Sequence, residues 1–158
     1  MLRPATPADT PAVLDLAVAT GLFPADEIDF LRGILDELHA GRLGPGHRLE
    51  IWTDDADGPA VGAVYFNADA TADRKWDLWM IAVLPERQGH GIGGDLIRFA
   101  EDFARDADGR LMLIDTSSLP KFYATQAFYA KHSYTEVARI PDFYADGDSK
   151  VVFSKRIT

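Results

Sequence analysis

The fold is decided by the stretch Pro85-Glu86-Arg87-Gln88-Gly89-His90-Gly91-Ile92-Gly93-Gly94, which lies just past the middle of the sequence. The preceding run, 76–83, becomes continuously apolar toward its end, as is typical of a strand buried at the centre of a sheet. The following segment, 92–107, has the apolar spacing of a helix and is stopped by Gly109. Four glycines in six residues leave backbone N–H groups uncovered where that helix begins, and its dipole favours a phosphate there. The stretch therefore predicts a strand, a phosphate-binding loop and a helix.

Outside this unit, short predicted helices and strands alternate. Thr6, Pro7 and Asp9 are typical of the N-cap, first-turn proline and third residue of a helix that runs to about Thr20. Further helices are predicted after Pro24, ending at 41, and from 120 to about 132. Strands are predicted at 1–3, 48–53, 60–67, 76–83, 111–115, 135–140 and 149–155. The order is βααβββαβαββ, which indicates an α/β (α+β) domain with a mixed sheet.

Composition narrows the classes of protein. The chain has 158 residues, 47% of them hydrophobic and 26% charged, so we expect a single domain over 1–158. The longest apolar run, 78–84, is too short to cross a bilayer, and the N-terminus resembles no secretion leader, so we expect a cytoplasmic protein. The absence of cysteine excludes a thiol nucleophile, a disulfide and a cysteine-ligated zinc. A net charge of −9 argues against nucleic-acid binding and is compatible either with a cationic ligand or simply with solubility.

Two phosphate-containing ligands compete for the glycine loop. Gly89, Gly91 and Gly94 spell G-x-G-x-x-G, and Asp115 ends the next predicted strand, as a dinucleotide site requires. However, residues 85–88 separate the strand from the first glycine, whereas the turn of a dinucleotide fold is tight. The motif also lies past mid-chain, which leaves little sequence for the rest of such a site. No Gly-Lys-Ser/Thr follows, so a Walker loop is excluded.

The same loop, written Gln88-x-x-Gly91-x-Gly93 after the strand Trp79–Val83, resembles the acetyl-CoA signature of the GNAT superfamily of N-acetyltransferases. The predicted element order matches that family along nearly the whole chain. The resemblance implies a mixed, mostly antiparallel sheet flanked by helices. It also implies acetyl-CoA as co-substrate, no metal, and direct acetyl transfer to a primary amine of a small molecule or protein in a ternary complex.

A second segment, Tyr129 followed by Ser133-Tyr134, resembles the Tyr-x-x-x-Gly-Phe segment that closes the cofactor site in this family. The match has departures. Ser133 replaces the glycine, and Phe122 and Thr125 stand where an asparagine and an alanine are common. The role of the tyrosine survives these changes, whereas an amide contact to the pantetheine arm does not.

The resemblance assigns roles to named residues. Main-chain groups of Ile81, Ala82 and Val83 line the pantetheine and thioester, and one N–H serves as oxyanion donor. The pyrophosphate is bound by the loop residues Gln88, Gly89, His90, Gly91, Ile92, Gly93 and Gly94. Tyr129 is the general acid, because a phenol is protonated at pH 7 and is well matched to a leaving thiolate. A core aromatic residue is the simpler interpretation of Tyr129.

The general base and the acceptor pocket are less determined. Asp77, early on the central strand, is our candidate base; Glu86, Asp115, His132 and a chain of water molecules remain open. Pocket aromatics are expected among Phe23, Phe30, Trp79, Phe143 and Tyr144. The segment 142–148 combines aromatic rings with carboxylates and suits an ammonium group, although a polar hairpin turn explains it equally well.

Two other functions stay open at this stage. One is a non-catalytic GNAT-like module that binds acyl-CoA as a sensor or partner-binding domain. The other is the dinucleotide oxidoreductase that G-x-G-x-x-G would suggest. A homodimer is common in the family and is compatible with the sequence.

Overall fold

The helices and strands follow one another in the predicted order. The computed structural model describes all 158 residues. Its strands are β1 (Leu2–Pro4), β2 (His47–Thr53), β3 (Ala60–Ala68), β4 (Lys75–Val83), β5 (Leu111–Ser117), β6 (Thr135–Ala145) and β7 (Asp148–Arg156). Its α-helices are α1 (Thr10–Ala19), α2 (Ile28–His39), α3 (Ile92–Asp106) and α4 (Tyr123–Lys131), with short 3₁₀ turns before each of α1, α2 and α4 and after β4.

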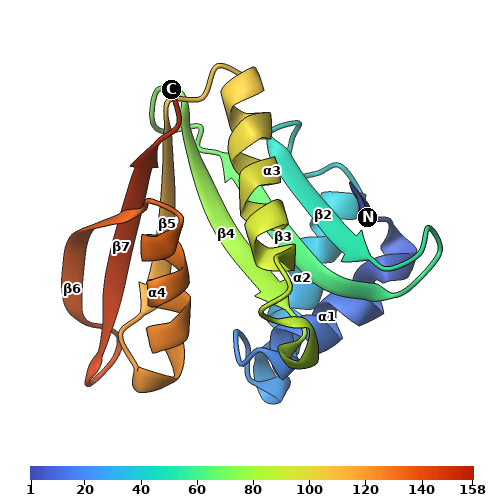
Figure 1. The fold of residues 1–158 in the computed structure, drawn as a ribbon, viewed down its shortest axis with the longest axis horizontal. Helices are drawn as coiled ribbons and strands as arrows, with labels where there is room; N and C mark the ends of the chain where they lie inside the picture. The colour runs from blue at the N-terminus through green and yellow to red at the C-terminus, as the bar shows by residue number, and fades with distance from the viewer. The chain divides into compact units, whose positions relative to one another are not determined.

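The strands form one mixed, mostly antiparallel sheet in the order β1-β2-β3-β4-β5-β7-β6, which confirms the predicted fold class. The chain divides into two compact units (Figure 1). Unit 1 comprises Met1–Asn67 and Met80–Ala100, and unit 2 comprises Ala68–Trp79 and Glu101–Thr158. Both β4 and α3 therefore contribute to both units. The single domain expected from the sequence stays a prediction.

Unit 1 has helices on both faces of its strands (Figure 1). On one face, α1 and α2 pack against a buried core that includes Leu16, Leu35, Ile51 and Met80. On the other face, α3 approaches β3 so closely that a Cβ at Gly62 would come within 3.0 Å of the Ile92 side chain. A methyl group at this position would require the Ile92 side chain, in the turn that follows the glycine loop, to move by a few tenths of an ångström.

The start of α1 confirms the predicted cap. The Thr6 backbone N–H donates to the Asp9 carboxylate at 2.8 Å, and the Asp9 N–H donates to the Thr6 carbonyl at 2.9 Å. Arg3 forms two further hydrogen bonds with the same carboxylate, both at 2.8 Å. Asp9 thus connects β1 to the helix. Its hydrogen bonds, of which the one with Arg3 has the largest effect, lower the pKa of Asp9 to about 2.

Unit 2 is organised around β5. The first residues of β4 pair parallel with β5, Asp77 opposite Leu113, while β7 pairs antiparallel on its other side. Helix α4 packs on these strands through Tyr129, whose ring lies 5.7 Å from that of Phe153 on β7. Trp76 on β4 packs against α3, where its ring centroid lies 5.9 Å from that of Phe103.

One strand is longer than predicted. We expected a strand that ends at Ile140, but β6 continues to Ala145, and the turn is confined to 146–147. Phe143 and Tyr144 favour an extended backbone. The register with β7 shifts between Ile140 and Ala145, where Asp142 has a φ of +55°. Gly147, with a φ of +80°, then makes the turn. The remaining bounds differ from the prediction by one to a few residues.

Candidate functional site

The end of β4 is fixed by its neighbour in unit 1. The side chains of Ala82 and Val83 are buried, as a core strand requires, and Ile81 is half-buried. The Leu84 N–H donates to the Val61 carbonyl on β3 at 2.9 Å, which anchors the point where the strand becomes the loop. The strand is thus a rigid support on which the predicted main-chain contacts to a thioester could be built.

Two residues of the glycine loop have a backbone conformation that favours glycine. Gly89 and Gly91 have φ values of +79° and +86°, in the left-handed region that side chains disfavour. A Cβ built on either glycine would meet no atom within 4 Å, so packing does not explain why they are glycines. The Asp95 N–H donates to the Gly91 carbonyl at 3.0 Å, the first bond of α3. The N–H groups of the first turn, from Ile92 on, have no partner within the helix and are suited to an anion.

Two side chains of the loop bond to its own backbone. The Gln88 amide Nε2 donates to the Val83 carbonyl at 3.0 Å and so ties the loop to the end of β4. The His90 Nδ1 lies 2.9 Å from the Gln88 carbonyl, a contact that requires a hydrogen on Nδ1. A neutral imidazole then has no second N–H. The predicted phosphate contact of His90 would therefore need the imidazolium form, whereas Gln88 stabilises the loop and leaves phosphate binding to the backbone.

An ion pair that sequence reasoning missed also anchors this loop. The Arg87 guanidinium forms a bidentate ion pair with the carboxylate of Asp54, in the turn between β2 and β3. Its Nη2 lies 2.6 Å from Asp54 Oδ1. The hydrogen bond raises the pKa of Arg87 and lowers that of Asp54. Thirty-three residues separate the two, so only their opposite charges could have suggested the pair.

Tyr129 is buried in unit 2, on α4, with only 5% of its surface exposed. Its ring lies among those of Phe128, Tyr134 and Phe153, at centroid distances of 5.7–6.2 Å. Burial raises the pKa of its hydroxyl well above the usual value, which keeps the group protonated. The residue is both a core aromatic and a phenol in the state that a general acid needs, and its catalytic role stays a prediction.

The departure from glycine at position 133 has a structural cost. Ser133 adopts a φ of +69°, the conformation for which a glycine is best suited. Its N–H donates to the Ala130 carbonyl, and the Tyr134 N–H donates to the Tyr129 carbonyl, both at 3.1 Å. The end of α4 therefore keeps its turn although the serine strains it.

Asp77, the candidate base, is engaged in an ion pair. The Lys75 Nζ lies 2.8 Å from Asp77 Oδ1 and 2.7 Å from Asp69 Oδ2, so one ammonium joins two carboxylates at the start of β4. This arrangement gives Asp77 a structural role in unit 2. Its assignment as base stays a prediction. Among the alternatives, Asp115 forms an ion pair with Lys150 at 3.0 Å, and the ring of His132 packs 4.5 Å from that of Phe128.

The acidic segment on the β6–β7 hairpin is partly structural. Asp142 accepts a hydrogen bond from the Gly147 N–H at 2.7 Å, and Asp148 accepts one from the Ser117 hydroxyl at 2.5 Å. Phe143 and Tyr144 are about half exposed, and the Lys150 ammonium lies 4.5 Å from the Phe143 ring centre. An ammonium group is thus already held beside an aromatic ring in this hairpin.

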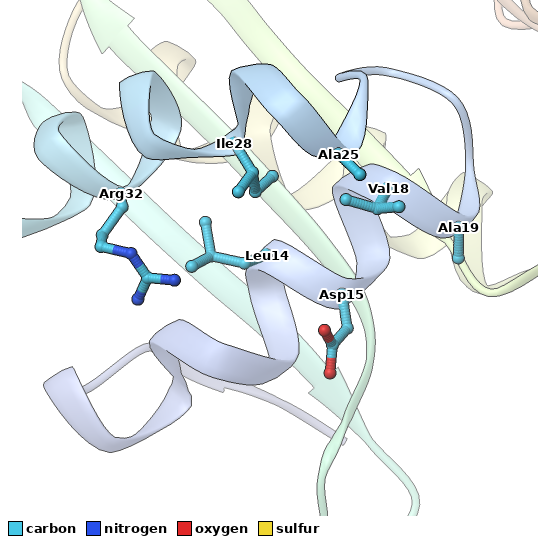
Figure 2. Close-up of a pocket in the computed structure, with 7 residues that line it drawn as sticks. All are labelled: Leu14, Asp15, Val18, Ala19, Ala25, Ile28 and Arg32. Carbon is cyan, nitrogen blue, oxygen red and sulfur yellow. The ribbon is translucent and has the colours of Figure 1, made fainter.

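A separate open groove of about 390 Å³ lies between α1 and α2 (Figure 2). Leu14 and Ile28 point toward one another across it. None of the predicted cofactor residues lines it; its lining is Leu14, Asp15, Val18, Ala19, Ala25, Ile28 and Arg32. Two of the expected pocket aromatics, Phe23 and Phe30, pack together in this unit at a centroid distance of 6.5 Å.

No group of three or more histidine or acidic side chains is arranged to hold a metal ion. No helix has the length and apolar character that crossing a bilayer requires.

The comparison with protein families decides the identity of the fold. Residues 47–136, more than half of the chain, match the model described as an acetyltransferase (GNAT) domain. The chain belongs to the GNAT acetyltransferase family. The match begins at β2 and includes the glycine loop and Tyr129, so it covers the segments on which the sequence resemblance rested. The chain is accordingly an acetyltransferase.

Solved structures agree with this assignment. A protein described as a GNAT-family acetyltransferase from Desulfovibrio desulfuricans is 26% identical, with a TM-score of 0.90 over 100% of this chain and 99% of that one. An aminoglycoside 6′-N-acetyltransferase complexed with coenzyme A has a TM-score of 0.75 at 15% identity, covering 100% and 97%. The ribosomal-protein-S18-alanine N-acetyltransferase from Escherichia coli has a TM-score of 0.77 at 17% identity, covering 100% and 94%. The last two show the shared fold. No curated protein matches the sequence.

Proposed function

We propose that this GNAT protein transfers the acetyl group of acetyl-CoA to a primary amine by direct attack within a ternary complex. The observation that carries the proposal is the conformation of the glycine loop. Gly89 and Gly91 have left-handed backbones with open space where a Cβ would lie, directly before the unpaired N–H groups of α3. A similar fold has been solved with coenzyme A bound, which supports this cofactor class.

The proposed chemistry assigns one task to each part of the site. The loop and the first turn of α3 bind the pyrophosphate through backbone N–H groups, assisted by the helix dipole. Main-chain groups of Ile81, Ala82 and Val83 bind the pantetheine and thioester, and an N–H stabilises the oxyanion that forms when the amine attacks. As the tetrahedral intermediate breaks down, Tyr129 protonates the leaving thiolate. No step requires a metal.

For the acceptor we propose a cationic amine. The chain carries a net charge of −9, and the β6–β7 hairpin already holds the Lys150 ammonium beside Phe143 and Asp115. Similar folds include enzymes named for aminoglycosides and for an alanine of a ribosomal protein, so both small molecules and protein amino groups belong in the search. We place the reaction in the cytoplasm, and a homodimer remains a prediction.

A CoA-release assay tests the proposal. Purified protein is incubated with acetyl-CoA and with a panel of polyamines, aminoglycosides, amino acids and peptides, and free thiol is measured. We expect saturable release with at least one amine and a product heavier by one acetyl group. Binding of acetyl-CoA without release for any amine would favour the non-catalytic sensor. A melting-temperature shift with NADH and none with CoA would favour the hypothesis of a dinucleotide-dependent oxidoreductase.

A further inference from the structure

Outside the cofactor loop, unit 1 contains a histidine–tyrosine pair that the proposed reaction does not yet use. His47 begins β2 and Tyr65 lies on β3, eighteen residues later, and the His47 Nδ1 is hydrogen-bonded to the Tyr65 hydroxyl. The two rings are stacked at a centroid distance of 5.9 Å. Tyr65 is 4% exposed, whereas His47 is half-buried and keeps a route to solvent.

The register of the sheet brings this pair close to the end of β4. The Leu84 N–H donates to the Val61 carbonyl, so β3 and β4 run antiparallel from that bond. At the other end of the pairing the Asp69 N–H donates to the Lys75 carbonyl, one residue out of step with the first bond, so Tyr65 lies within one residue of the level of Met80. Both side chains belong to the same buried cluster. Met80 immediately precedes Ile81, the first residue proposed to line the thioester.

The protonation states of both residues suit a proton transfer in which the Tyr65 hydroxyl is the bridge and the His47 imidazole is the acceptor. Burial raises the pKa of Tyr65 to about 12, so its hydroxyl keeps its hydrogen at neutral pH. Burial lowers the pKa of His47, so the imidazole is neutral at pH 7. When the neutral imidazole carries its hydrogen on Nε2, the protonated phenol donates its own hydrogen to the lone pair of Nδ1.

We propose that His47 is the general base of the acetyl transfer and that it receives the proton of the acceptor amine through the Tyr65 hydroxyl. This assignment rests on the proposed function. In the step, the ammonium gives one proton to the Tyr65 oxygen while Tyr65 passes its own hydrogen to the His47 Nδ1. The products are a neutral amine, an unchanged phenol and an imidazolium. The amine lone pair can then attack the thioester, and the exposed edge of His47 returns the proton to water.

Charged neighbours do not interfere with this role. Arg48 and Glu50, next along β2, pair with each other at 2.6 Å, and strand alternation directs them to the opposite face from His47. No charged residue occurs in β3. The end of α2 carries Glu37, which Arg42 engages, and His39. Burial lowers the pKa of His47, and no charged side chain contributes to that shift.

The first arm of the test does not depend on turnover. In ¹⁵N-labelled protein, histidine NMR should show His47 at pH 7.5 with hydrogen on Nε2, a bare Nδ1 and a pKa below ~6.5, the ordinary histidine value. Tyr65→Phe should shift the Nδ1 resonance. A hydrogen on Nδ1 at this pH would overturn the proposal, because the phenol could then not donate to it.

The second arm uses the best amine found in the CoA-release panel. We expect His47→Gln to lower kcat by roughly 10²- to 10⁴-fold without changing the melting-temperature shift caused by acetyl-CoA. In the pH profile of kcat/KM, the apparent pKa of the acid limb is expected below ~6.5 in the wild type. In His47→Gln it should move toward the pKa of the amine itself, near 10. Tyr65→Phe should cost a similar factor, and the double variant should lose little more, since both residues act in one step. His39→Gln is the matched control and should behave as the wild type.

The outcomes separate the two proposals. An active wild type with an unchanged rate and pH profile in His47→Gln would overturn the role of His47 and leave the proposed function intact. An unchanged rate in Tyr65→Phe alone would overturn the bridging step. If no amine of the panel causes the wild type to release CoA, the proposed function is overturned, and the role of His47 with it.

Discussion

At the scale of single residues, two glycines with the same backbone geometry offer a direct test of the cofactor loop. Gly91 and Gly44 have φ values of +86° and +88°, and neither has an atom within 4 Å of where its Cβ would lie. Gly91→Glu and Gly44→Glu should therefore suffer similar backbone strain. Only Gly91→Glu would place a carboxylate against the pyrophosphate.

We expect acetyl-CoA at roughly 100 times Kd to raise the melting temperature of the wild type and of Gly44→Glu by about 5–10 °C. Gly91→Glu should show no shift. Thermal denaturation with increasing acetyl-CoA is the measurement, and a folded Gly91→Glu with a full shift would remove the loop from the cofactor site.

Tyr129 and Tyr123 lie on the same helix, one buried and the other 60% exposed, and so form a second matched pair. Tyr129→Phe keeps the ring and deletes the hydroxyl, so folding and acetyl-CoA binding should survive. If the phenol is the acid, kcat should fall by roughly 10²- to 10⁴-fold, while Tyr123→Phe changes nothing. Because burial raises the pKa of Tyr129, its deprotonation should cause no alkaline loss of wild-type activity below pH ~10. Equal turnover in Tyr129→Phe, with chemistry rate-limiting, would make Tyr129 a packing residue only.

At the scale of elements, the start of α1 makes a prediction about acid stability. The pKa of Asp9 is lowered from 3.8 to about 2, so this carboxylate stabilises the fold fully above pH ~4. Its contribution, about 2 kcal/mol, should be lost as the pH falls from 4 toward 2. Asp9→Asn should reduce the free energy of unfolding by a similar amount at pH 7 and remove this part of the acid dependence. Urea unfolding at pH 2, 4 and 7 measures both effects, and parallel curves for the two proteins would contradict the assignment.

Elements also show which features a sequence can reveal. The cap of α1 and the loop before α3 are local, since their interacting groups lie within a few residues, and both were predicted. The extension of β6 was missed because a positive φ at Asp142 lets the strand continue through a polar stretch. The pairs Arg87–Asp54 and His47–Tyr65 were missed for a different reason. Their members lie 33 and 18 residues apart, and only the strand register brings them together.

At the scale of the whole molecule, the net charge of −9 predicts acceptor preference. Attraction between exposed charges is screened over ~8 Å at physiological salt, so it should influence encounter more than tight binding. Cationic amines should be better acceptors than acidic amino acids, and added salt should lower kcat/KM mainly by raising KM.

Asp146→Asn is the cleaner test of the local contribution, because Asp148 accepts hydrogen bonds from Ser117 and Ser118 and its removal would disturb the hairpin. Asp55→Asn, in the turn between β2 and β3, changes the net charge equally and serves as control. Asp146→Asn should weaken the preference for cations more than Asp55→Asn does. Glutamate or aspartate as the best acceptor, without salt dependence, would make the acidity a solubility feature.

The division of the chain also bears on its synthesis. Unit 1 uses no residue beyond Ala100, so every strand and helix of its core is synthesised before β5. In unit 2, β5 must wait for β7, because Leu111 pairs with Arg156. Leu111 and Arg156 are 45 positions apart, a length of chain that takes about 2–9 s to synthesise at typical elongation rates. During that interval β5 is without its antiparallel neighbour, so a ribosome that pauses between β5 and β7 would hold a nascent chain with an unpaired strand edge, which favours aggregation.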